Sequence, residues 1–495
     1  MGRRRIATRI FLTGWIVFSA HFASNIVRES YLAVALGDGF SVRVDDYLGL
    51  HPDLFEIPGR GAYINSNPGA SMMGAVPYVL ARPLLHLLYR ARPSLLAPKP
   101  PATYDDPRPN RSRFMNEARA RGVDIKLALA AAVMQVGLMA PASALIMVLM
   151  YYFLCARLRE ESQAMWLALL YGFGTPVFFR TAFLNQNLLL AHFVLLAFAA
   201  LAWPRDATAA DDNRWEILAG FSLGMGILCD YSATPIVFVF GAWVFTVRAM
   251  DDGMTSALRS ATRLGVGAVG PVALLLSYQG IAFGTPWFPA QRYMPATDFS
   301  VLGWNGMTLP TAQLLWDNLF SPAYGLFVFS PMLAAAAAAP FFRQGAGKLP
   351  GREIALIILA TSALWLFNSA NQFSNLQFNT GVRYMVPIVP LLFVALVPVL
   401  LQAPRIIVWA LLVPTIVISW SASMAREDIP TSLARVFLGG PELPWLTVLG
   451  RTASAYAPFL GEGTSPTAVF ALLAAVTWLI WRGGNPLEPL SQPGR

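Results

Sequence analysis

The sequence predicts an all-α, polytopic membrane protein with about 12 transmembrane helices and one large polar loop after the first of them. Apolar residues make up 56% of the 495 residues and charged residues only 13%, against about 25% charged in an average soluble domain. Apolar runs of about 20 residues recur along the chain, and they are continuous rather than alternating. Because a spanning segment must satisfy its own backbone polar groups in lipid, continuous runs predict helices and not a barrel.

The predicted spans follow the apolar runs in order. The first run begins at Ile10 behind the basic start of the chain and lacks a small-residue cleavage site, so we interpret it as a retained signal anchor. Together the runs place membrane helices near residues 8–26, 127–155, 163–180, 184–203, 216–230, 233–250, 263–283, 324–342, 354–370, 384–401, 405–421 and 466–482. Another apolar stretch, residues 72–89, contains Pro77 and Pro83 and either crosses the membrane or lies along its surface.

The distribution of arginine and lysine decides between these two placements. If residues 72–89 do not cross, every short basic loop and both termini lie on the cytoplasmic side, whereas a crossing turns nearly all of them outward. We therefore expect an interfacial or re-entrant helix at 72–89. The outer face then carries residues 27–126, 284–323, 371–383 and 422–465. The predicted domains are a transmembrane module over 1–421, and residues 422–495 with an outer loop, a last membrane helix and a cytoplasmic tail.

The composition disfavours several classes of site and partner. The two cysteines, Cys155 and Cys229, fall inside apolar runs, which argues against a structural disulfide or a thiolate metal site. Most of the formal charge of +9 lies in loops, where orientation and contact with anionic membrane lipids explain it better than nucleic acid does. No internal repeat is visible in the sequence, which weighs against the inverted repeats of many secondary transporters.

Carboxylates gather in the first outer loop. Glu29, Asp45, Asp46 and Asp53 lie within a short stretch at the predicted outer surface. A transferase needs a carboxylate to take a proton from its acceptor hydroxyl, so these residues are candidate general bases. Glu29 is preferred, because it follows the first helix directly and begins an amphipathic run. The alternatives are an N-terminal helix charge at Glu29, a turn at Asp45 and Asp46, and an ordinary polar loop throughout.

Cations and polar groups also gather at or near the outer ends of later helices. Arg383 is the only cation between residues 371 and 390, among several amides, and a guanidinium there is suited to bidentate binding of phosphate. Its alternative role is a snorkelling anchor. Arg292 lies in an aromatic segment that fits sugar stacking and an interfacial aromatic belt equally well. Inside the spans, His192 is a candidate substrate-lining residue, although hydrogen-bonded packing is the commoner role of such a histidine.

Seven motifs occur in an order that resembles one enzyme superfamily. They are Arg28-Glu29 with the run to Gly39-Phe40; Gly61-Ala-Tyr63 with Asn67-Pro68-Gly69-Ala-Ser71; Tyr171-Gly-Phe-Gly-Thr-Pro176; Leu218-Ala-Gly-Phe-Ser-Leu-Gly-Met-Gly226; Phe283-Gly-Thr-Pro286; Ser321-Pro322 with Gly325-Leu-Phe-Val-Phe-Ser-Pro331; and Gly381-Val-Arg-Tyr384 before Pro387. In this order the chain resembles, from its first helix to about Pro390, the bacterial lipid-phosphate-sugar-dependent glycosyltransferases of the GT-C superfamily. That superfamily also holds protein O-mannosyltransferases and aminoarabinose transferases.

The resemblance implies a GT-C type bundle whose large first extracytoplasmic loop carries interfacial helices, in the bacterial cytoplasmic (inner) membrane. Such enzymes take a sugar from a polyprenyl phosphate or pyrophosphate on the outer, periplasmic face. Their acidic residue follows the first helix, where Glu29 matches best. The matching motifs place Tyr63, Asn65, Asn67 and Tyr384 along the substrate. No cofactor or metal is expected from this resemblance, although the loop aspartates offer ligands for a divalent ion.

Two departures from the resemblance bear on the site. Many relatives carry an acidic residue a few positions before Glu29, which this chain lacks, so the base stays open between Glu29 and the later aspartates. Relatives often have Lys at the position of Ser66 and an acid at that of Asn65. If such a Lys touches the donor phosphate, Arg60 and Arg383 are the nearest candidates to replace it here.

Three functions follow from these observations. The leading hypothesis is a glycosyltransferase that moves a sugar from a lipid-linked donor to an acceptor hydroxyl on a glycan, lipid or protein. A transporter or flippase for lipid-linked sugars needs charges through the membrane interior, whereas here they gather at the outer face. A catalytically inactive relative is the third hypothesis, because of the residues at positions 65 and 66.

Overall fold

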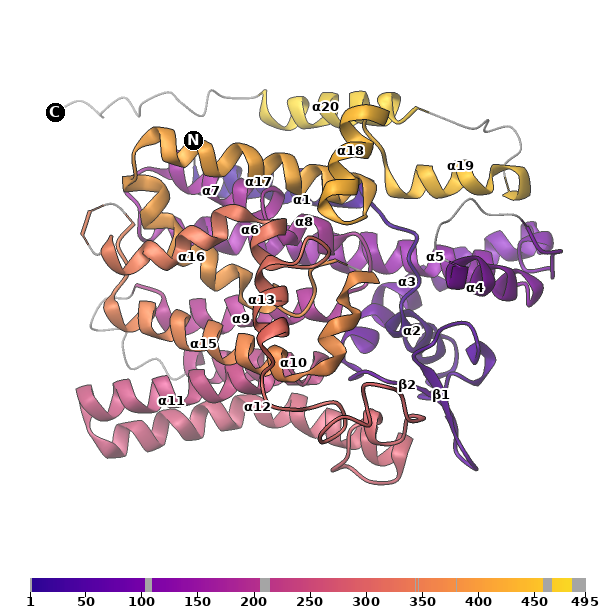
Figure 1. The fold of residues 1–495 in the computed structure, drawn as a ribbon, viewed down its shortest axis with the longest axis horizontal. Coiled ribbons are helices and arrows are strands. Elements are labelled where there is room, and N and C mark those ends of the chain that lie inside the picture. The colour runs from indigo at the N-terminus through magenta and orange to yellow at the C-terminus, as the bar shows by residue number, and fades with distance from the viewer. Residues whose placement is uncertain are drawn as a thin grey trace.

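The computed structural model describes residues 2–102, 109–204, 214–342, 344–345, 347–379, 381–456 and 465–482, and these residues are mostly helical (Figure 1). The N-terminal elements are α1 (Arg3–Ala20), α2 (Arg28–Gly39), η1 (Asp45–Tyr47), β1 (Leu54–Ile57), β2 (Gly61–Ile64), α3 (Gly69–Ala91), η2 (Pro93–Leu95) and α4 (Pro109–Ala120). The central elements are α5 (Asp124–Met134), η3 (Gln135–Met139), α6 (Ala140–Cys155), α7 (Glu161–Phe173), α8 (Pro176–Thr181), α9 (Gln186–Ala202), α10 (Arg214–Cys229), α11 (Ala233–Asp252) and α12 (Met254–Phe283). The C-terminal elements are η5 (Ala290–Arg292), α13 (Ala312–Phe320), α14 (Leu326–Phe329), η6 (Pro331–Phe341), α15 (Gly351–Ala370), η7 (Gln372–Asn379), η8 (Val386–Ile388), α16 (Val389–Gln402), α17 (Arg405–Ala425), α18 (Ile429–Gly439), α19 (Pro444–Tyr456) and α20 (Thr467–Trp481).

Five helices of the described chain are long and apolar enough to cross a membrane. One is the continuous 32-residue helix Asp124–Cys155, formed by α5, η3 and α6, and the others are α11, α12, α15 and α17. A helix of 20 residues is about 30 Å long, which equals the thickness of the hydrocarbon core. These helices indicate a multi-pass membrane protein.

The remaining predicted spans are helical but shorter, more charged or interrupted, so a count of about 12 spans is not shown by length and composition. The span predicted at 163–180 is divided, because α7 ends before Gly174 and α8 opens at Pro176. The span predicted at 324–342 consists of α14 and η6, and η6 is a 3₁₀ helix of 11 residues that begins at Pro331. A 3₁₀ helix rises about 2 Å per residue, so it covers more length per residue than an α-helix does.

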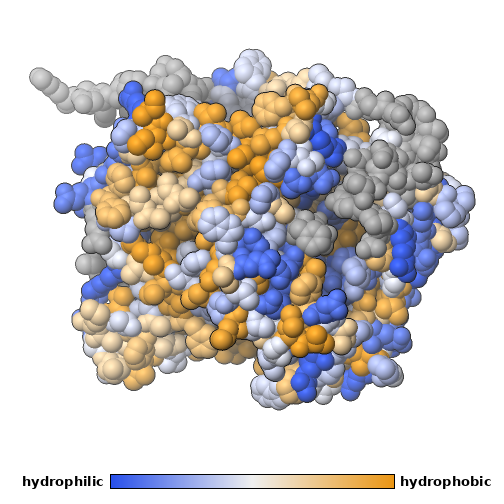
Figure 2. All heavy atoms as spheres, in the orientation of Figure 1, coloured by the Kyte–Doolittle hydropathy of each residue, from blue (hydrophilic) through white to orange (hydrophobic). Residues whose placement is uncertain are grey.

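The long helices run side by side and give the molecule two ends (Figure 1). The start of α1 and the end of α20 lie at one end, together with the turn between α11 and α12. The first loop, with α2, α3, α4 and the hairpin of β1 and β2, forms the opposite end. Apolar residues cover much of the side over α11 and α12, and hydrophilic residues gather toward the first-loop end (Figure 2). Both described ends of the chain thus lie opposite the first loop.

α3 is a continuous helix of 23 residues even though it contains Pro77 and Pro83. Its start lies against the C-terminal end of α10, and Tyr89 near its end lies within electrostatic range of Lys126 at the start of α5. Its exposed side carries apolar residues three or four positions apart, which are Val76, Val79, Leu80, Leu84 and Leu87. A helix with both ends at the first-loop end of the bundle and an exposed apolar stripe is suited to lie along a membrane surface.

The predicted domain boundary at residue 421 falls inside α17, which runs unbroken to Ala425. α18 packs on α17, and the indole of Trp445 in α19 donates a hydrogen bond to the backbone oxygen of Ala20 at 3.0 Å. The described residues after 421 therefore continue the bundle. The predicted cytoplasmic tail after residue 482 lies outside the described residues.

α10 and α12 approach each other through glycines. A Cβ added at Gly220 would meet the backbone carbonyl of Leu264, and one added at Gly267 would meet that of Ile217. Small residues at such a contact let two membrane helices pack backbone against backbone and gain van der Waals attraction. The glycines of the 218–226 motif thus have a packing role.

Gly220→Leu is expected to force α10 away from α12 and to lower the free energy of unfolding by about 2 kcal/mol, because overpacking a tight contact destabilises by amounts of that order. Thermal unfolding of the purified chain, followed by tryptophan fluorescence, measures the change. Gly241→Leu in α11 is the matched control, since nothing lies within 4 Å of a Cβ there. Equal unfolding temperatures for wild type and the Gly220 variant would contradict the close approach.

Candidate functional site

Arg28 joins two carboxylates at the first-loop end of the bundle. Its Nε donates to Oε1 of Glu29 at 2.9 Å, and its Nη1 donates to Oδ2 of Asp53 at 2.8 Å. The second oxygen of Asp53 is also engaged, because Nδ2 of Asn65 donates to Oδ1 at 3.0 Å. Glu29 is 5% exposed, and Oε1 is its one oxygen that bonds to a described side chain. Oε2 of Glu29 makes no hydrogen bond to a described side chain.

The local fold places these groups together. α2 begins at Arg28, so Glu29 stands in the first turn, where the helix dipole favours a carboxylate. Asp53 precedes β1 and Asn65 follows β2, and the antiparallel register sets them opposite each other. The backbone amide of Asn65 donates to the carbonyl of Asp53 at 3.1 Å, and the amide of Asp53 donates to Nδ1 of His51 at 3.0 Å. The hairpin thus holds Asp53 beside the start of α2.

Neighbouring charges shift the pKa values of Asp53 and Arg28. Burial opposes ionisation of Asp53, but the positive charges of Arg28 and Arg383 and the hydrogen bond from Arg28 outweigh it, so the pKa of Asp53 is lowered. Burial also opposes the charge of Arg28, and the carboxylates of Glu29 and Asp53 outweigh it, so the pKa of Arg28 is raised. A carboxylate with a lowered pKa is a weak proton acceptor near neutral pH. Asp53 is therefore suited to hold Arg28 in place.

Arg383 and Tyr384 form a second wall of the site. The side-chain oxygen of Gln377 accepts hydrogen bonds from both of their backbone amides, at 3.2 and 2.9 Å. The Arg383 guanidinium lies 4.4 Å from the ring centroid of Tyr384, and its Nη2 donates to the Tyr384 hydroxyl at 2.6 Å. Nε of Arg383 is buried and makes no hydrogen bond to a described residue. It is a donor that an anionic ligand can satisfy.

The two walls meet around Arg180 of α8. Arg180 lies within electrostatic range of Glu29, Arg383 and Tyr384, and Asp53 lies within range of Arg383. Glu29 and Arg383 thus both lie near Arg180, although they are far apart in the sequence. We call this site the arginine–carboxylate cluster, and it consists of Arg28, Glu29, Asp53, Arg180, Arg383 and Tyr384.

Two arginines at the cluster are not identified by sequence analysis. Arg180 is fully buried, and its guanidinium lies 5.7 and 5.6 Å from the ring centroids of Phe179 and Phe183. Arg426 lies 4.3 Å from the ring centroid of Phe179 and within electrostatic range of Arg180. Aromatic faces stabilise both cations. Each arginine sits next to an apolar run, where sequence alone predicts an interface anchor.

One signal for Arg180 is present in the sequence. Thr175 and Pro176 stand within the span predicted at 163–180, and proline is favoured at the first position of a new helix. In the structure the Thr175 hydroxyl accepts a hydrogen bond from the amide of Val177 at 3.3 Å, so α8 starts there as a separate helix. The interruption turns Arg180 into the protein.

Asp45 and Asp46 lie outside the arginine–carboxylate cluster. Oδ1 of Asp45 accepts a hydrogen bond from the amide of Ala62 at 2.6 Å, and its Oδ2 pairs with Arg43 at 2.6 Å. Asp46 is exposed beside it in η1. These contacts show that Asp45 stabilises a turn, which is the alternative to a catalytic role for Asp45 and Asp46.

Arg60 and Arg292 also lie outside the cluster, near the end of α12. Arg60 is exposed and lies against Gly284, and Arg292 is exposed with its guanidinium 4.8 Å from the ring centroid of Phe288. The segment of Arg292 borders the site, because the neighbouring Gln291 donates to the backbone oxygen of Asn65 at 2.8 Å.

Tyr63 and Asn67, predicted to line the substrate, have packing partners in the structure. Tyr63 is buried, with its ring centroid 5.5 Å from that of Phe283. Asn67 donates to the backbone oxygen of Ile227 at 2.6 Å and ties the first loop to α10.

His192, Asn65 and Tyr384 are the remaining predicted lining residues. His192 is buried in α9, with Nε2 3.0 Å from the hydroxyl of Ser143, which in turn contacts Thr181. This network has the form of hydrogen-bonded packing between helices. Asn65 contacts the arginine–carboxylate cluster through Asp53, and Tyr384 belongs to the cluster and is bonded to Arg383.

The arrangement places an anion-binding surface beside an available carboxylate oxygen. Guanidinium groups bind phosphate through charge-assisted, often bidentate hydrogen bonds. Among the described residues, no group of three or more His, Cys, Asp and Glu side chains is placed to hold a metal ion. Comparison of the chain with protein-family models, with curated proteins and with solved structures finds no match.

Proposed function

We propose that the chain is a membrane glycosyltransferase that moves a hexosyl or pentosyl group from a polyprenyl-phosphate or pyrophosphate donor to an acceptor hydroxyl. The reaction takes place on the outer face of the bacterial cytoplasmic membrane. The observation that carries the proposal is the arginine–carboxylate cluster, in which Glu29 offers one available oxygen beside buried guanidinium groups. The order of motifs that resembles the GT-C enzymes supports the same reaction.

In this proposal Arg383 and Arg180 bind the donor phosphate. Negative charge grows on the phosphate as its bond to the sugar breaks, and donors already oriented in a water-poor site stabilise that charge best. The buried Nε of Arg383 is such a donor. The hydrogen bonds from Gln377 hold the backbone of Arg383 in place.

Glu29 acts as general base in the same step. Its Oε2 takes the proton of the acceptor hydroxyl, the acceptor oxygen bonds to the anomeric carbon, and the bonding pair of the sugar–phosphate bond leaves with the phosphate. Arg28 holds Oε1 of Glu29, and Asp53 holds Arg28, so the base is oriented through two charge-assisted bonds.

The proposal includes a membrane placement with about 12 crossings, both termini in the cytoplasm, α3 along the outer surface and the cluster outside. Cysteines introduced at the exposed positions Ser94 and Thr255 are expected to react with an impermeant thiol reagent from opposite sides of the membrane. Cys155 and Cys229 are buried and do not compete for the reagent. Labelling of both positions from the same side would contradict the topology and the outer placement of the site.

The reaction itself is tested with purified protein and lipid-linked sugars extracted from the native host. A new glycosidic bond, with release of the polyprenyl phosphate, supports the transferase. Movement of the lipid-linked sugar across vesicles without a new bond supports a transporter, and donor binding without turnover or movement supports an inactive relative. Either of the last two outcomes contradicts the proposed function.

A further inference from the structure

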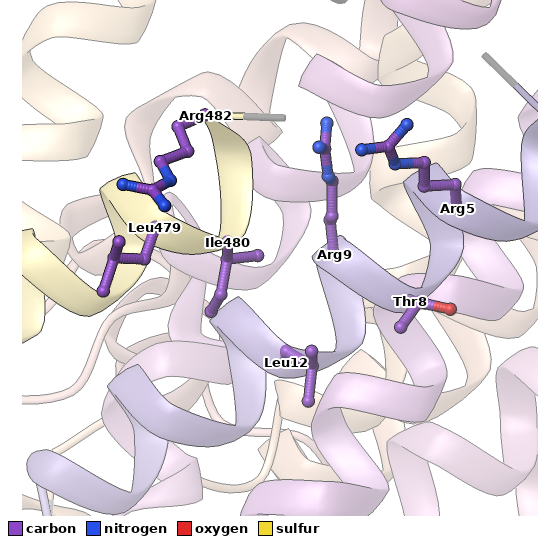
Figure 3. Close-up of a pocket in the computed structure, with 7 residues that line it drawn as sticks. All are labelled: Arg5, Thr8, Arg9, Leu12, Leu479, Ile480 and Arg482. Atoms are coloured by element: carbon purple, nitrogen blue, oxygen red, sulfur yellow. The ribbon is translucent and has the colours of Figure 1, made fainter. Parts of the chain in front are cut away.

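The acceptor of the proposed reaction must bind at the first-loop end of the bundle, because its hydroxyl has to reach Glu29. Figure 3 shows a pocket between α1 and α20, whose lining includes Leu12 and Leu479. This pocket lies at the opposite end of the bundle, so it cannot hold an acceptor at Glu29. The groups that bind the acceptor are therefore sought among the side chains around Glu29.

His51 lies beside the arginine–carboxylate cluster, in the turn that precedes β1. Its Nδ1 accepts a hydrogen bond from the backbone amide of Asp53 at 3.0 Å and lies 3.9 Å from Oδ2 of the same residue. The imidazole stands edge-on to the ring of Tyr31 in α2, with 6.2 Å between the ring centroids. It is within electrostatic range of Glu29 and Arg28. These contacts hold the imidazole next to the carboxylates of the cluster.

The hydrogen bond at Nδ1 determines what His51 offers to a substrate. Burial lowers the pKa of His51 by more than the nearby carboxylates raise it, so the ring is neutral near neutral pH. A neutral imidazole that accepts at Nδ1 carries its proton on Nε2. Nε2 makes no hydrogen bond to a described residue, and 22% of the side chain is exposed. His51 thus presents a hydrogen-bond donor rather than a base.

Asn65 leaves a polar atom without a partner on the other side of Asp53. Its Nδ2 donates to Oδ1 of Asp53 at 3.0 Å, whereas its own Oδ1 is buried and accepts no hydrogen bond from a described residue. Buried polar atoms are normally hydrogen-bonded, so an unsatisfied acceptor next to the cluster indicates that a ligand supplies the donor. A hydroxyl group both donates and accepts hydrogen bonds. The donor of His51 and the acceptor of Asn65 therefore suit a ligand rich in hydroxyls.

We infer that His51 binds the acceptor, by donating a hydrogen bond from Nε2 to an oxygen beside the hydroxyl that reacts at Glu29. The inference rests on the proposed function. It narrows the acceptor to a molecule that carries a second oxygen close to the reacting hydroxyl. A sugar with neighbouring hydroxyl groups meets this requirement, and a simple long-chain alcohol does not. The contact orients the reacting hydroxyl toward the anomeric carbon of the donor sugar.

The test measures sugar transfer by the purified full chain, with lipid-linked sugar from the native host as donor and a titrated envelope extract of that host as acceptor. His51→Asn removes the Nε2 donor but keeps an oxygen that can accept the amide two residues on, as asparagine does in turns. We expect the acceptor concentration at half-maximal rate to rise about 3- to 10-fold, as the loss of one neutral hydrogen bond predicts. Donor binding and the unfolding temperature are expected to stay at their wild-type values.

Two further variants complete the test. The side-chain nitrogen of His51→Gln reaches the place of Nε2, so this variant is expected to need less acceptor than His51→Asn does. His86→Asn is the matched control, because His86 is exposed on α3 and lies outside the cluster. It is expected to behave as wild type in the same titration.

Three outcomes overturn the inference. An unchanged acceptor requirement in His51→Asn would show that Nε2 binds no acceptor oxygen. A loss of donor affinity in the same variant would show that His51 only supports the fold of the cluster. An equal rise in His86→Asn would show an effect that does not depend on the site. If wild type transfers no sugar at all, the proposed function fails and the inference fails with it, so the two failures are distinguished.

Discussion

Glu29→Gln is expected to slow sugar transfer by about 10²- to 10⁴-fold while leaving the affinity for the donor close to that of wild type. The amide keeps the shape of the side chain and an oxygen for the bond from Arg28, but it cannot take the proton of the acceptor. Single-turnover transfer from a lipid-linked donor measures the rate. Equilibrium binding of the same donor measures the affinity.

Asp53→Asn is the matched comparison, because it also neutralises a carboxylate bonded to Arg28. Both Asp53 oxygens are already engaged, so we expect a smaller loss that comes from poorer orientation of Arg28 and Glu29. Full activity of the Glu29 variant, together with loss of activity in the Asp53 variant, would indicate that Asp53 is the base and that Glu29 only positions Arg28.

Arg383→Ala is expected to weaken donor binding by about 10- to 100-fold, because hydrogen bonds to charged groups contribute about 1.5–3 kcal/mol. The transfer rate is expected to fall as well, since the lost donor also stabilises the departing phosphate. Arg383→Lys should restore only part of the affinity, because an ammonium lacks the bidentate fork.

Arg292→Ala is the control for donor binding, because Arg292 is an exposed cation outside the cluster. Donor titrations of the two alanine variants compare the sites directly. If donor binding is weaker in the Arg292 variant and unchanged in the Arg383 variant, the phosphate binds at the surface near the end of α12 and not at the cluster.

Composition predicts the helical, membrane-spanning character of the chain well, because long apolar runs have few other stable states in lipid. It predicts the length of individual helices less well. Gly174 and Pro176 divide one apolar run, and Pro331 begins a 3₁₀ helix in another. In both cases the apolar run is longer than any single helix within it. α3 is the reverse case, since Pro77 and Pro83 do not break it.

The sequence singles out Glu29 and Arg383 as candidates because a charged group at the end of an apolar run is conspicuous. It does not identify Arg180, whose role depends on an interrupted helix that turns it into the protein. It also cannot separate Asp45 from Asp53. The two differ in their place in the fold, because the hairpin register sets Asp53 opposite Asn65, whereas Asp45 lies in η1 and accepts a hydrogen bond from the amide of Ala62.

The central claim is that the arginine–carboxylate cluster holds the donor phosphate beside the base. The most direct test is an experimental structure of the chain with a non-hydrolysable polyprenyl-phosphate sugar bound. The phosphate is expected within about 3 Å of Arg383 and Arg180 nitrogens, with Glu29 facing the anomeric carbon from the other side. Phosphate bound at Arg60 and Arg292, or a Glu29 carboxylate turned away from the sugar, would contradict it.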